Sequence, residues 1–582
     1  MMASRASKAF ESPYSRPAHP AVAGTDEGTE FMIPRFLALL AMAAGFLAIA
    51  QPAAAAWHKA ESDRFIIYSD SRAEDLEQFA QMLERYHVAM ELESGRSVPI
   101  PSHSNRLTIY MVGTRDELRD LYGAGSRSAV GGFYIPRANG SVTFVPNIRI
   151  STRDGSRGRT GTRYQRSSGT SDLDSALSTL LHEYTHHFLI SSARHAMPRW
   201  LSEGAAEYFS SARFNDDGSV DLGLPNNDRA WEISKAAPVS LRELLDYDLY
   251  RENRGGRYDA YYGRAWLLFH YLRFNPPRAG QLERYWAAVA SGVDSMAAAE
   301  QIFGDLDRLE SELRDYGRTT SMSGMRFAAA DITIGAVSVL ELSAGHAAMM
   351  DVIIRSDRGV DSEMAQTVVA DARSVAERYP NDAEVLAALA EAEYDAGNDD
   401  AAITAARRAI AVNPSVTNAY VQQGYALFRK AEDAEDKDAA YAAAMAPFEA
   451  LNAIETDHTQ PLIYFYRSFV SRGVSPPDGA KFALERATQL APFDQDLAVE
   501  VASMKAADGD PVIARYLLAP VAANPHGGKR SSLAQAMMDY LATVNDGSRV
   551  SFASLVEQFE AADEIGADEG EDGGADGDGD GD

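Results

Sequence analysis

The sequence of 582 residues predicts an α+β protein, in which a small mixed sheet with two metal-binding helices is followed by an all-α solenoid. Three observations carry this prediction. Short β-rich runs and an amphipathic helix come first, a His-Glu-x-x-His motif begins at His182, and Ala-rich helical patterns repeat beyond about residue 344. A chain of this length exceeds what one hydrophobic core normally supports, so at least two domains are expected.

The composition excludes several classes of protein. The chain has 55 Lys and Arg against 84 Asp and Glu, a formal net charge of −29. This charge argues against nucleic acid or an anionic membrane as the main partner, because either needs a basic surface. There is no cysteine, so disulfides and thiolate metal ligands are excluded.

The beginning of the chain has the features of a targeting segment. Residues 1–31 have no periodicity and are interpreted as a non-native extension caused by start-site choice. Met32–Ala56 is predicted to be a signal peptide, since Arg35 precedes the apolar run Phe36–Ala50 and small residues follow. The protein is therefore expected to be secreted or periplasmic, without a stable membrane span after cleavage. The alternative is a membrane anchor formed by an uncleaved signal.

The next part of the chain predicts the elements of a sheet. The run 65–68 and the run 106–112 are β-rich, and apolar residues at three- and four-residue spacing between them predict a helix over 73–92. The runs 132–136 and 141–146 flank Asn139-Gly140, which is a strong hairpin signal. Residues 151–172, rich in Gly, Ser, Thr and Arg, have two open interpretations: a cover of the cleft that attracts an acidic or phosphorylated substrate, or a solvated insertion.

The motif at His182 predicts a zinc site. His182 and His186 are one helical turn apart, so their side chains point the same way and can bind one zinc ion. Glu183 lies about 100° round the helix from His182, which places its carboxylate beside the metal as a base and not as a ligand. A catalytic zinc also needs a third protein ligand.

A second helix, beginning near Pro198, is expected to supply that ligand. If the chain turns back antiparallel, Glu203 faces the two histidines. Glu207 lies four residues further on the same face, where it can accept the spare ring N–H of a ligating histidine; the alternative is a solvated carboxylate. His187 and His195 are expected to be packed or solvated, without a role at the metal.

Residues Leu181–Phe209 resemble the gluzincin metallopeptidases, the peptidase-MA-like group. The pattern of this family is H-E-x-x-H followed by a helix with W-L-x-E-G-x-A-E-Y, and the match is close over this stretch. The resemblance implies a zinc peptidase domain over residues 57–325. It also implies that the strand 141–145 lies at the sheet edge and pairs with an extended substrate, although a purely structural hairpin is the alternative.

The resemblance extends to a downstream helix that begins with tyrosine. Ala260–Leu272 is similar to it, and the implied role of its tyrosine is to donate a hydrogen bond to the developing oxyanion. Tyr262 is the first candidate, ahead of Tyr261. The alternative is that these rings belong to the core.

The C-terminal part repeats with a countable period. Equivalent helix ends fall at Pro380, Pro414, His458, Pro492 and Pro525, with spacings of 34, 44, 34 and 33 residues. This period resembles tetratricopeptide repeats over residues 345–545, and the longer spacing is attributed to a charged insertion near 430–437. Leu386, Leu389, Ala390, Ala402 and Ala409 take positions that resemble the packing positions of that family. The alternative for residues 345–545 is an irregular helical bundle. The acidic tail 558–582 is expected to be disordered.

Together these features predict a zinc-dependent metallopeptidase. Zinc held by His182, His186 and Glu203 would acidify water and polarise the scissile carbonyl, with Glu183 as the base. The helical repeats would recruit a peptide or protein substrate or a protein partner. Two alternatives remain: a catalytically silent repeat scaffold, and a metal hydrolase that acts on a non-peptide envelope substrate.

Overall fold

The computed structural model describes residues 56–123, 130–148, 172–193, 195–319, 321–524 and 527–557. The predicted N-terminal extension, nearly all of the signal peptide, the Arg-rich segment up to residue 171 and the acidic tail lie outside the described residues. The described residues all belong to one compact unit. No helix in the described ranges is long and apolar enough to span a membrane.

A six-stranded mixed sheet forms the first layer, with the strand order β4-β5-β3-β2-β1-β9. Its strands are β1 (His58–Glu61), β2 (Phe65–Ser69), β3 (Leu107–Val112), β4 (Phe133–Ile135), β5 (Val142–Pro146) and β9 (Ser338–Glu341). Strands β2, β3 and β5 are parallel to one another, and the remaining pairs are antiparallel. Strand β9 lies in the stretch between the two ranges that the sequence assigned to domains.

The edge strand differs from the one expected from the sequence. The strand expected at the edge, residues 141–145, is β5, which pairs with β3 on one side and β4 on the other. The predicted hairpin at Asn139-Gly140 is confirmed, with Gly140 at a φ of 96°. This tight turn folds β4 back along the free side of β5, so β4 becomes the edge.

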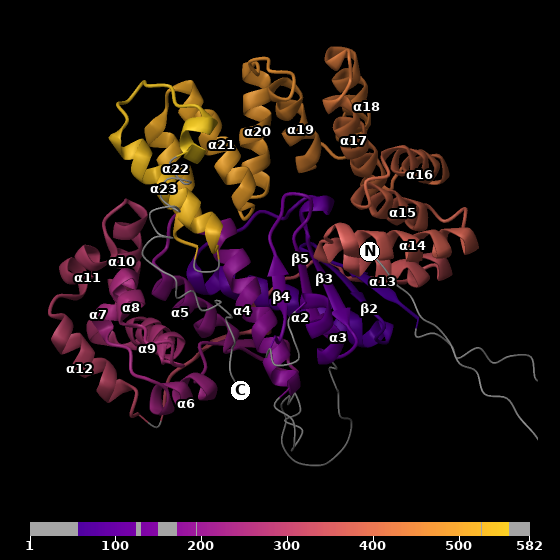
Figure 1. Cartoon of the computed structure of the whole chain (residues 1–582). Helices are drawn as coiled ribbons and strands as arrows, with labels where there is room; N and C mark the ends of the chain where they lie inside the picture. The colour runs from indigo at the N-terminus through magenta and orange to yellow at the C-terminus, as the bar shows by residue number, and fades with distance from the viewer. Residues whose placement is uncertain are drawn as a thin grey trace, which may run out of the picture. The chain divides into compact units, whose positions relative to one another are not determined.

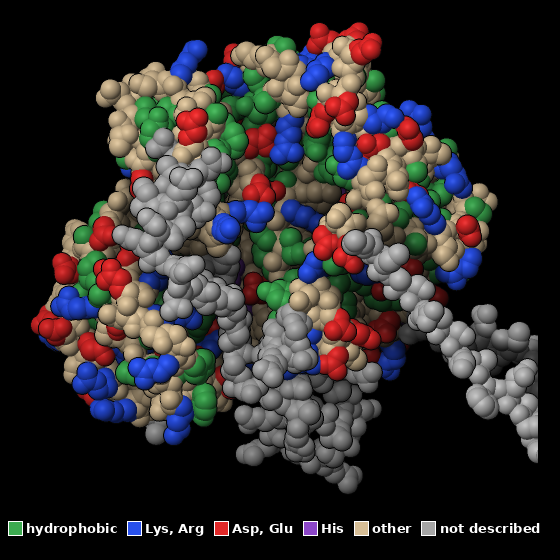
Figure 2. All heavy atoms as spheres, in the orientation of Figure 1, with side chains coloured by type: hydrophobic (Ala, Val, Ile, Leu, Met, Phe, Trp, Pro, Cys, Tyr) green, Lys and Arg blue, Asp and Glu red, His purple; other side chains and the backbone are tan. Residues whose placement is uncertain are grey.

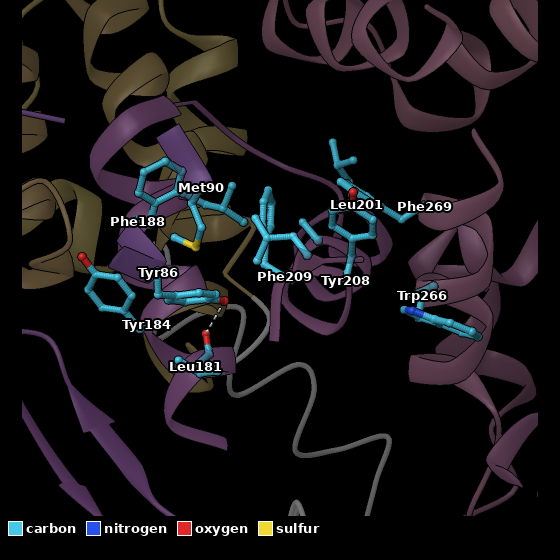
Figure 3. Close-up of a cluster of buried hydrophobic side chains, with 14 of the residues drawn as sticks. Tyr86, Met90, Leu181, Tyr184, Phe188, Leu201, Tyr208, Phe209, Trp266 and Phe269 are labelled. Atoms are coloured by element: carbon cyan, nitrogen blue, oxygen red, sulfur yellow. Dashed lines mark hydrogen bonds between the residues drawn. The ribbon is translucent and has the colours of Figure 1, made fainter. Parts of the chain in front are cut away.

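Helix α2 (Ala73–Ser94) holds the metal-motif helix α4 (Asp172–Ala193) in the core. The Tyr86 hydroxyl lies 2.9 Å from Thr185 Oγ1 and donates to the Leu181 carbonyl at 3.3 Å (Figure 3). His87 Nδ1 lies 2.6 Å from the Tyr184 hydroxyl. These contacts fix the rotation of α4, so His182 and His186 face away from α2.

Helix α5 (Arg199–Ser210) follows α4 and packs against α9 (Tyr261–Phe274). Large buried side chains fill this contact, including Tyr208, Trp266 and Phe269 (Figure 3). The other elements of this part are α3 (Arg115–Tyr122), α6 (Asn227–Lys235), α7 (Leu241–Leu245), α8 (Tyr247–Asn253), α10 (Gln281–Ala290), α11 (Ser295–Phe303), α12 (Leu306–Tyr316) and a second sheet of β6 (Arg213–Phe214), β7 (Val220–Leu222) and β8 (Met325–Phe327). Short 3₁₀ helices lie at His103–Asn105, Pro276–Arg278 and Ala329–Asp331.

The C-terminal region is an all-helical repeat, as the sequence predicts, in which successive helices pack side by side (Figure 1). Its helices are α13 (Ala344–Arg358), α14 (Ser362–Arg378), α15 (Ala383–Asp395), α16 (Asp399–Val412), α17 (Thr417–Glu432), α18 (Lys437–Ile454), α19 (Thr459–Val470), α20 (Asp478–Leu490), α21 (Gln495–Asp508), α22 (Pro511–Ala522) and α23 (Lys529–Thr543). Pro380, Pro414, His458 and Pro492 each follow shortly after the second helix of a pair; Pro525 lies outside the described residues. The mixed α+β class is therefore confirmed.

The long repeat unit is accommodated by its helices. Helices α17 and α18 have 16 and 18 residues, whereas α15 and α16 have 13 and 14. Most of the extra length of this repeat therefore lies in the two longer helices. The charged stretch near 430–437 forms the end of α17, the start of α18 and the short connection between them. The five expected packing positions between Leu386 and Ala409 are all buried.

The turn between β4 and β5 contacts the repeats directly. The Ala138 amide donates to Asp494 Oδ2 at 2.6 Å, and the Thr459 hydroxyl donates to the Ala138 carbonyl. Ala138 is also buried in an apolar cluster with Leu484 and Phe493.

Acidic and basic side chains are interspersed over the face of the molecule that Figure 2 shows.

Candidate metal centre

Three side chains from α4 and α5 converge on one point. His182 Nε2 and His186 Nε2 lie 3.1 Å apart, and Glu203 Oε2 lies 3.3 Å from the first and 3.5 Å from the second. Zinc bonds of about 2.0–2.1 Å in tetrahedral geometry place neighbouring ligand atoms about 3.3–3.4 Å apart. The three donors therefore fit a single zinc ion, with two nitrogens and one carboxylate oxygen as the ligand set.

Glu207 supports His182 from the other side of the imidazole ring. Its Oε1 lies 3.3 Å from His182 Nδ1, so the ring can donate its N–H to the carboxylate while Nε2 points at the other ligands. Arg229 Nη2 donates to Glu207 Oε1 at 2.7 Å, and Asn226 Nδ2 donates to Oε2 at 3.1 Å. Such a carboxylate fixes the tautomer of a ligating histidine and raises its basicity.

The electrostatics of these groups favour a cation at the centre. Burial would raise the pKa of Glu207, but the Arg229 charge and His182 lower it to about 2. Burial would lower the pKa of His182, but hydrogen bonds to Glu203 and Glu207 raise it well above its usual value. Two buried carboxylates thus stabilise a positive charge at His182. A divalent ion bound between Glu203 and the ring would provide that positive charge in place of the proton.

His186 is oriented by a neighbour on the second helix. Its Nδ1 lies 3.1 Å from the Ser202 hydroxyl, and Ser202 is the residue before Glu203. The second helix therefore supplies both a candidate ligand, Glu203, and a hydrogen-bond partner, Ser202, for the spare nitrogen of His186. This keeps Nε2 of His186 directed at the centre.

Glu183 lies one helical turn before His187 on α4, so the two side chains share one face of the helix. Glu183 is partly exposed, and its charge contributes, after burial, to the raised pKa of Tyr134 on the edge strand β4. The Tyr134 hydroxyl in turn lies 2.8 Å from His187 Nδ1. The base candidate is therefore near the strand that forms the free edge of the sheet.

The two tyrosines at the start of α9 occupy different environments. Tyr261 is buried and its ring lies against Tyr250, with centroids 4.5 Å apart. Tyr262 is partly exposed, and its hydroxyl accepts a hydrogen bond from Arg199 Nη2 at 3.4 Å. Tyr262 is thus the more accessible of the two hydroxyls.

The remaining histidines of this stretch are packed. The His187 ring lies 4.8 Å from the Phe493 ring of the repeats, and burial lowers its pKa to about 3. His195 Nε2 accepts a hydrogen bond from Trp286 Nε1 at 2.8 Å. Both side chains belong to the structural surroundings of the centre.

Some residues of the centre were not found from the sequence. Three of them form hydrogen bonds to side chains of the centre: Ser202, Asn226 and Arg229. Their residue types are common, and the sequence of α6 contains no motif that would have singled them out. For Ser202 alone a signal existed, because it adjoins Glu203. Asn226 and Arg229 depend on how the chain returns to α5 after the second sheet.

Comparison with known proteins gives limited matches. A family model described as a protein of unknown function, DUF1570, matches residues 176–280, which contain all six predicted site residues, from His182 to Tyr262. No curated protein matches the chain.

Solved structures of repeat proteins are similar to part of the chain. One is TTC0263, a thermophilic TPR protein of Thermus thermophilus, with 14% identity over 34% of this chain and 95% of that chain and a TM-score of 0.27. A crystal structure of MamA has 17% identity over 32% of this chain and 96% of its own, and the MamA RS-1 ArsTM double mutant has 15% identity over 31% and 95%; both have a TM-score of 0.24.

Proposed function

We propose that this chain is a secreted or periplasmic zinc metallopeptidase of the gluzincin type. The observation that carries the proposal is the convergence of His182, His186 and Glu203 within 3.5 Å of one another, at the spacing that one tetrahedral ion requires. The buried Glu207 behind His182 supports the same interpretation, because ligating histidines usually have such a partner.

The placement of the side chains supports the following chemistry. A zinc ion held by His182, His186 and Glu203 would supply a Lewis acid, which would lower the pKa of water and polarise the scissile carbonyl. Glu183 accepts the proton of the attacking water and returns it to the leaving amine. Tyr262 donates a hydrogen bond to the oxyanion, and the edge strand β4 pairs with the extended substrate.

The helical repeats contribute recruitment in this proposal. Their contacts with the β4–β5 turn place them close to the strand that pairs with substrate. A protein substrate or a protein partner bound by the repeats would then be delivered beside the metal centre.

The test compares wild type with Glu183→Gln, which keeps the size of the side chain and removes the base. Removal of a positioned general base slows turnover by about 10² to 10⁴. The variant should therefore bind about one zinc per chain, as wild type does, and cleave casein or a peptide library at least about a hundredfold more slowly. Elemental analysis measures the metal, and mass spectrometry measures cleavage.

A matched control is Glu300→Gln, an exposed carboxylate on α11. It should leave both zinc content and turnover unchanged. Equal cleavage by wild type and Glu183→Gln would contradict the mechanism. Hydrolysis of envelope fragments but not of peptides would show that the enzyme is a metal hydrolase with a non-peptide substrate.

A further inference from the structure

Arg199 lies next to the candidate metal centre on the same helix. It is the first residue of α5, four residues before Glu203, so the two side chains share one face of the helix about one turn apart. Burial would lower the pKa of Arg199, but Tyr262 and Glu203 raise it instead. The guanidinium is thus within electrostatic reach of the third ligand, and it is partly exposed to solvent.

Neutral groups hold this cation. Its Nη1 donates to the Tyr247 hydroxyl and its Nη2 donates to the Tyr262 hydroxyl at 3.4 Å. The guanidinium carbon lies 4.9 Å from the centre of the Tyr247 ring and 5.7 Å from that of Tyr261. Its Nε has no hydrogen-bond partner among the described residues.

The comparison with Arg229 shows why this arrangement is unusual. Arg229, also close to the centre, forms ion pairs with Glu207 and Glu232. None of the ion pairs in the described part of the chain includes Arg199. A poorly hydrated guanidinium without a carboxylate is costly, and a bidentate carboxylate is the ligand that its geometry suits best.

An apolar cavity adjoins Arg199. Its volume is about 230 Å³, and its walls include Met197, Leu244, Leu245 and Val289. Arg199 is the one charged residue among the described residues that line it. Pockets for whole drug-sized ligands measure about 300–1,000 Å³, so this cavity suits a single amino-acid side chain.

We propose that Arg199, with the hydroxyl of Tyr247, binds a carboxylate of the substrate, and that the cavity, which both residues line, takes the aliphatic side chain of the same substrate residue. A C-terminal leucine or similar residue carries both groups, so the substrate class is a peptide with a free, apolar C-terminus. This inference rests on the proposed peptidase function, since it describes the substrate of the same centre.

Binding measurements test the subsite without hydrolysis. The full chain with Glu183→Gln, loaded with zinc, is titrated by calorimetry with three acetylated tetrapeptides. One is Ala-Ala-Ala-Leu with a free C-terminus, the second is its C-terminal amide, and the third is the amide with Glu in place of Leu. The free acid should bind at least about tenfold more tightly than its amide, as expected for a hydrogen bond to a charged group.

Three further variants, made in the same background, assign the effect to residues. Arg199→Met should abolish the preference for the free acid, and Arg199→Lys should retain part of it. Val289→Phe should fill the cavity, so acetylated Ala-Ala-Ala-Leu should lose its advantage over a fourth peptide, acetylated Ala-Ala-Ala-Ala with a free C-terminus, while the acid preference remains. Zinc content and melting temperature show that each variant is folded.

Equal binding of acid and amide would overturn the proposal. Tight binding of the Glu-containing amide would overturn the assignment to the chain terminus and move the carboxylate to an acidic side chain. Cleavage by the chain with Glu183 intact is measured separately. Cleavage without acid preference would contradict the subsite alone, and acid preference without cleavage would contradict the peptidase proposal alone.

Discussion

At the scale of single residues, Glu203 and Glu207 are both buried carboxylates on one helix, yet their neighbours give them different tasks. Glu203 faces both histidine Nε2 atoms, whereas Glu207 faces the rear nitrogen of one histidine and is held by Arg229. In the proposed zinc site Glu203 would be a ligand, and Glu207 would hold the ligand His182 in position.

This difference predicts unequal effects on metal affinity. Glu203→Gln removes a ligand and should leave zinc bound far more weakly than in wild type. Glu207→Gln keeps a hydrogen-bond acceptor near His182 and should weaken zinc binding only about 10- to 100-fold. Competition with a chromogenic chelator measures both affinities. The reverse order would show that the two glutamates have exchanged roles.

Some residues of the centre can be predicted from the local sequence pattern and others cannot. His182, His186, Glu203 and Glu207 repeat at one-turn spacing, so helical periodicity alone predicts which face they share. Arg229 cannot be predicted in this way, because it reaches Glu207 across 22 residues through a turn and a short sheet. The local sequence pattern predicts which face of a helix a side chain lies on. A partner such as Arg229 comes from another part of the chain and is found only in the tertiary structure.

At the scale of elements, the contact between α5 and α9 decides where Glu203, the third candidate ligand, lies. A Cβ atom at Gly204 would lie 2.6 Å from the Ala265 carbonyl oxygen and 3.2 Å from Phe269 Cβ. The two helices thus approach at a glycine that is adjacent to Glu203. Any side chain there must push α5 away from α9.

Gly204→Ala should therefore destabilise the protein and disturb the metal centre. Alanine gains about 1 kcal/mol of helix propensity over glycine, but overpacking against a fixed backbone costs about 1–3 kcal/mol or more. Urea unfolding should show a net loss of stability, and zinc affinity should fall because Glu203 moves. The control is Gly479→Ala on α20, where no atom lies within 4 Å, and there stability should hold or rise slightly.

The elements themselves were predicted to different degrees. The repeat helices were predictable because Pro380, Pro414 and Pro492 recur where helices end. The position of β4 at the sheet edge was not, because the hairpin signal fixes which strands pair and says nothing about which one stays outermost. Strand β9 was missed since three of its four residues are exposed and none is buried, which leaves no alternation of apolar and polar residues to detect.

At the scale of the whole molecule, the repeats hold the sheet through a charged contact. Arg137, in the β4–β5 turn, donates to Asp357 Oδ1 at 2.6 Å and to the Asp357 carbonyl at 3.0 Å, and Tyr110 donates to Oδ2. Glu391 and Asp395 of α15 lie near the same charges. Three acids thus share one arginine where the sheet meets α13 and α15.

This contact predicts a pH dependence of stability. Burial, followed by the charges of Asp357 and Asp395, raises the pKa of Glu391 to about 8, and burial raises that of Asp395 to about 6. The folded state therefore keeps protons that the unfolded chain has released above about pH 4.5. Folding stability should be fully retained below that pH and should decrease as the pH rises toward 8, by about 1.4 kcal/mol per unit of pKa difference.

Glu391→Gln isolates this contribution to the pH dependence. The amide carries no charge at any pH and can still accept the hydrogen bond that Asn418 Nδ2 donates to Glu391 Oε2 at 2.8 Å. The loss of melting temperature between pH 5 and pH 8, measured by calorimetry, should therefore be smaller in the variant than in wild type. Glu377→Gln, on an exposed position of α14, should reproduce the wild-type profile. Parallel profiles for wild type and Glu391→Gln would mean that Glu391 is already ionised in the folded protein, and that Arg137 neutralises α15 as well as Asp357.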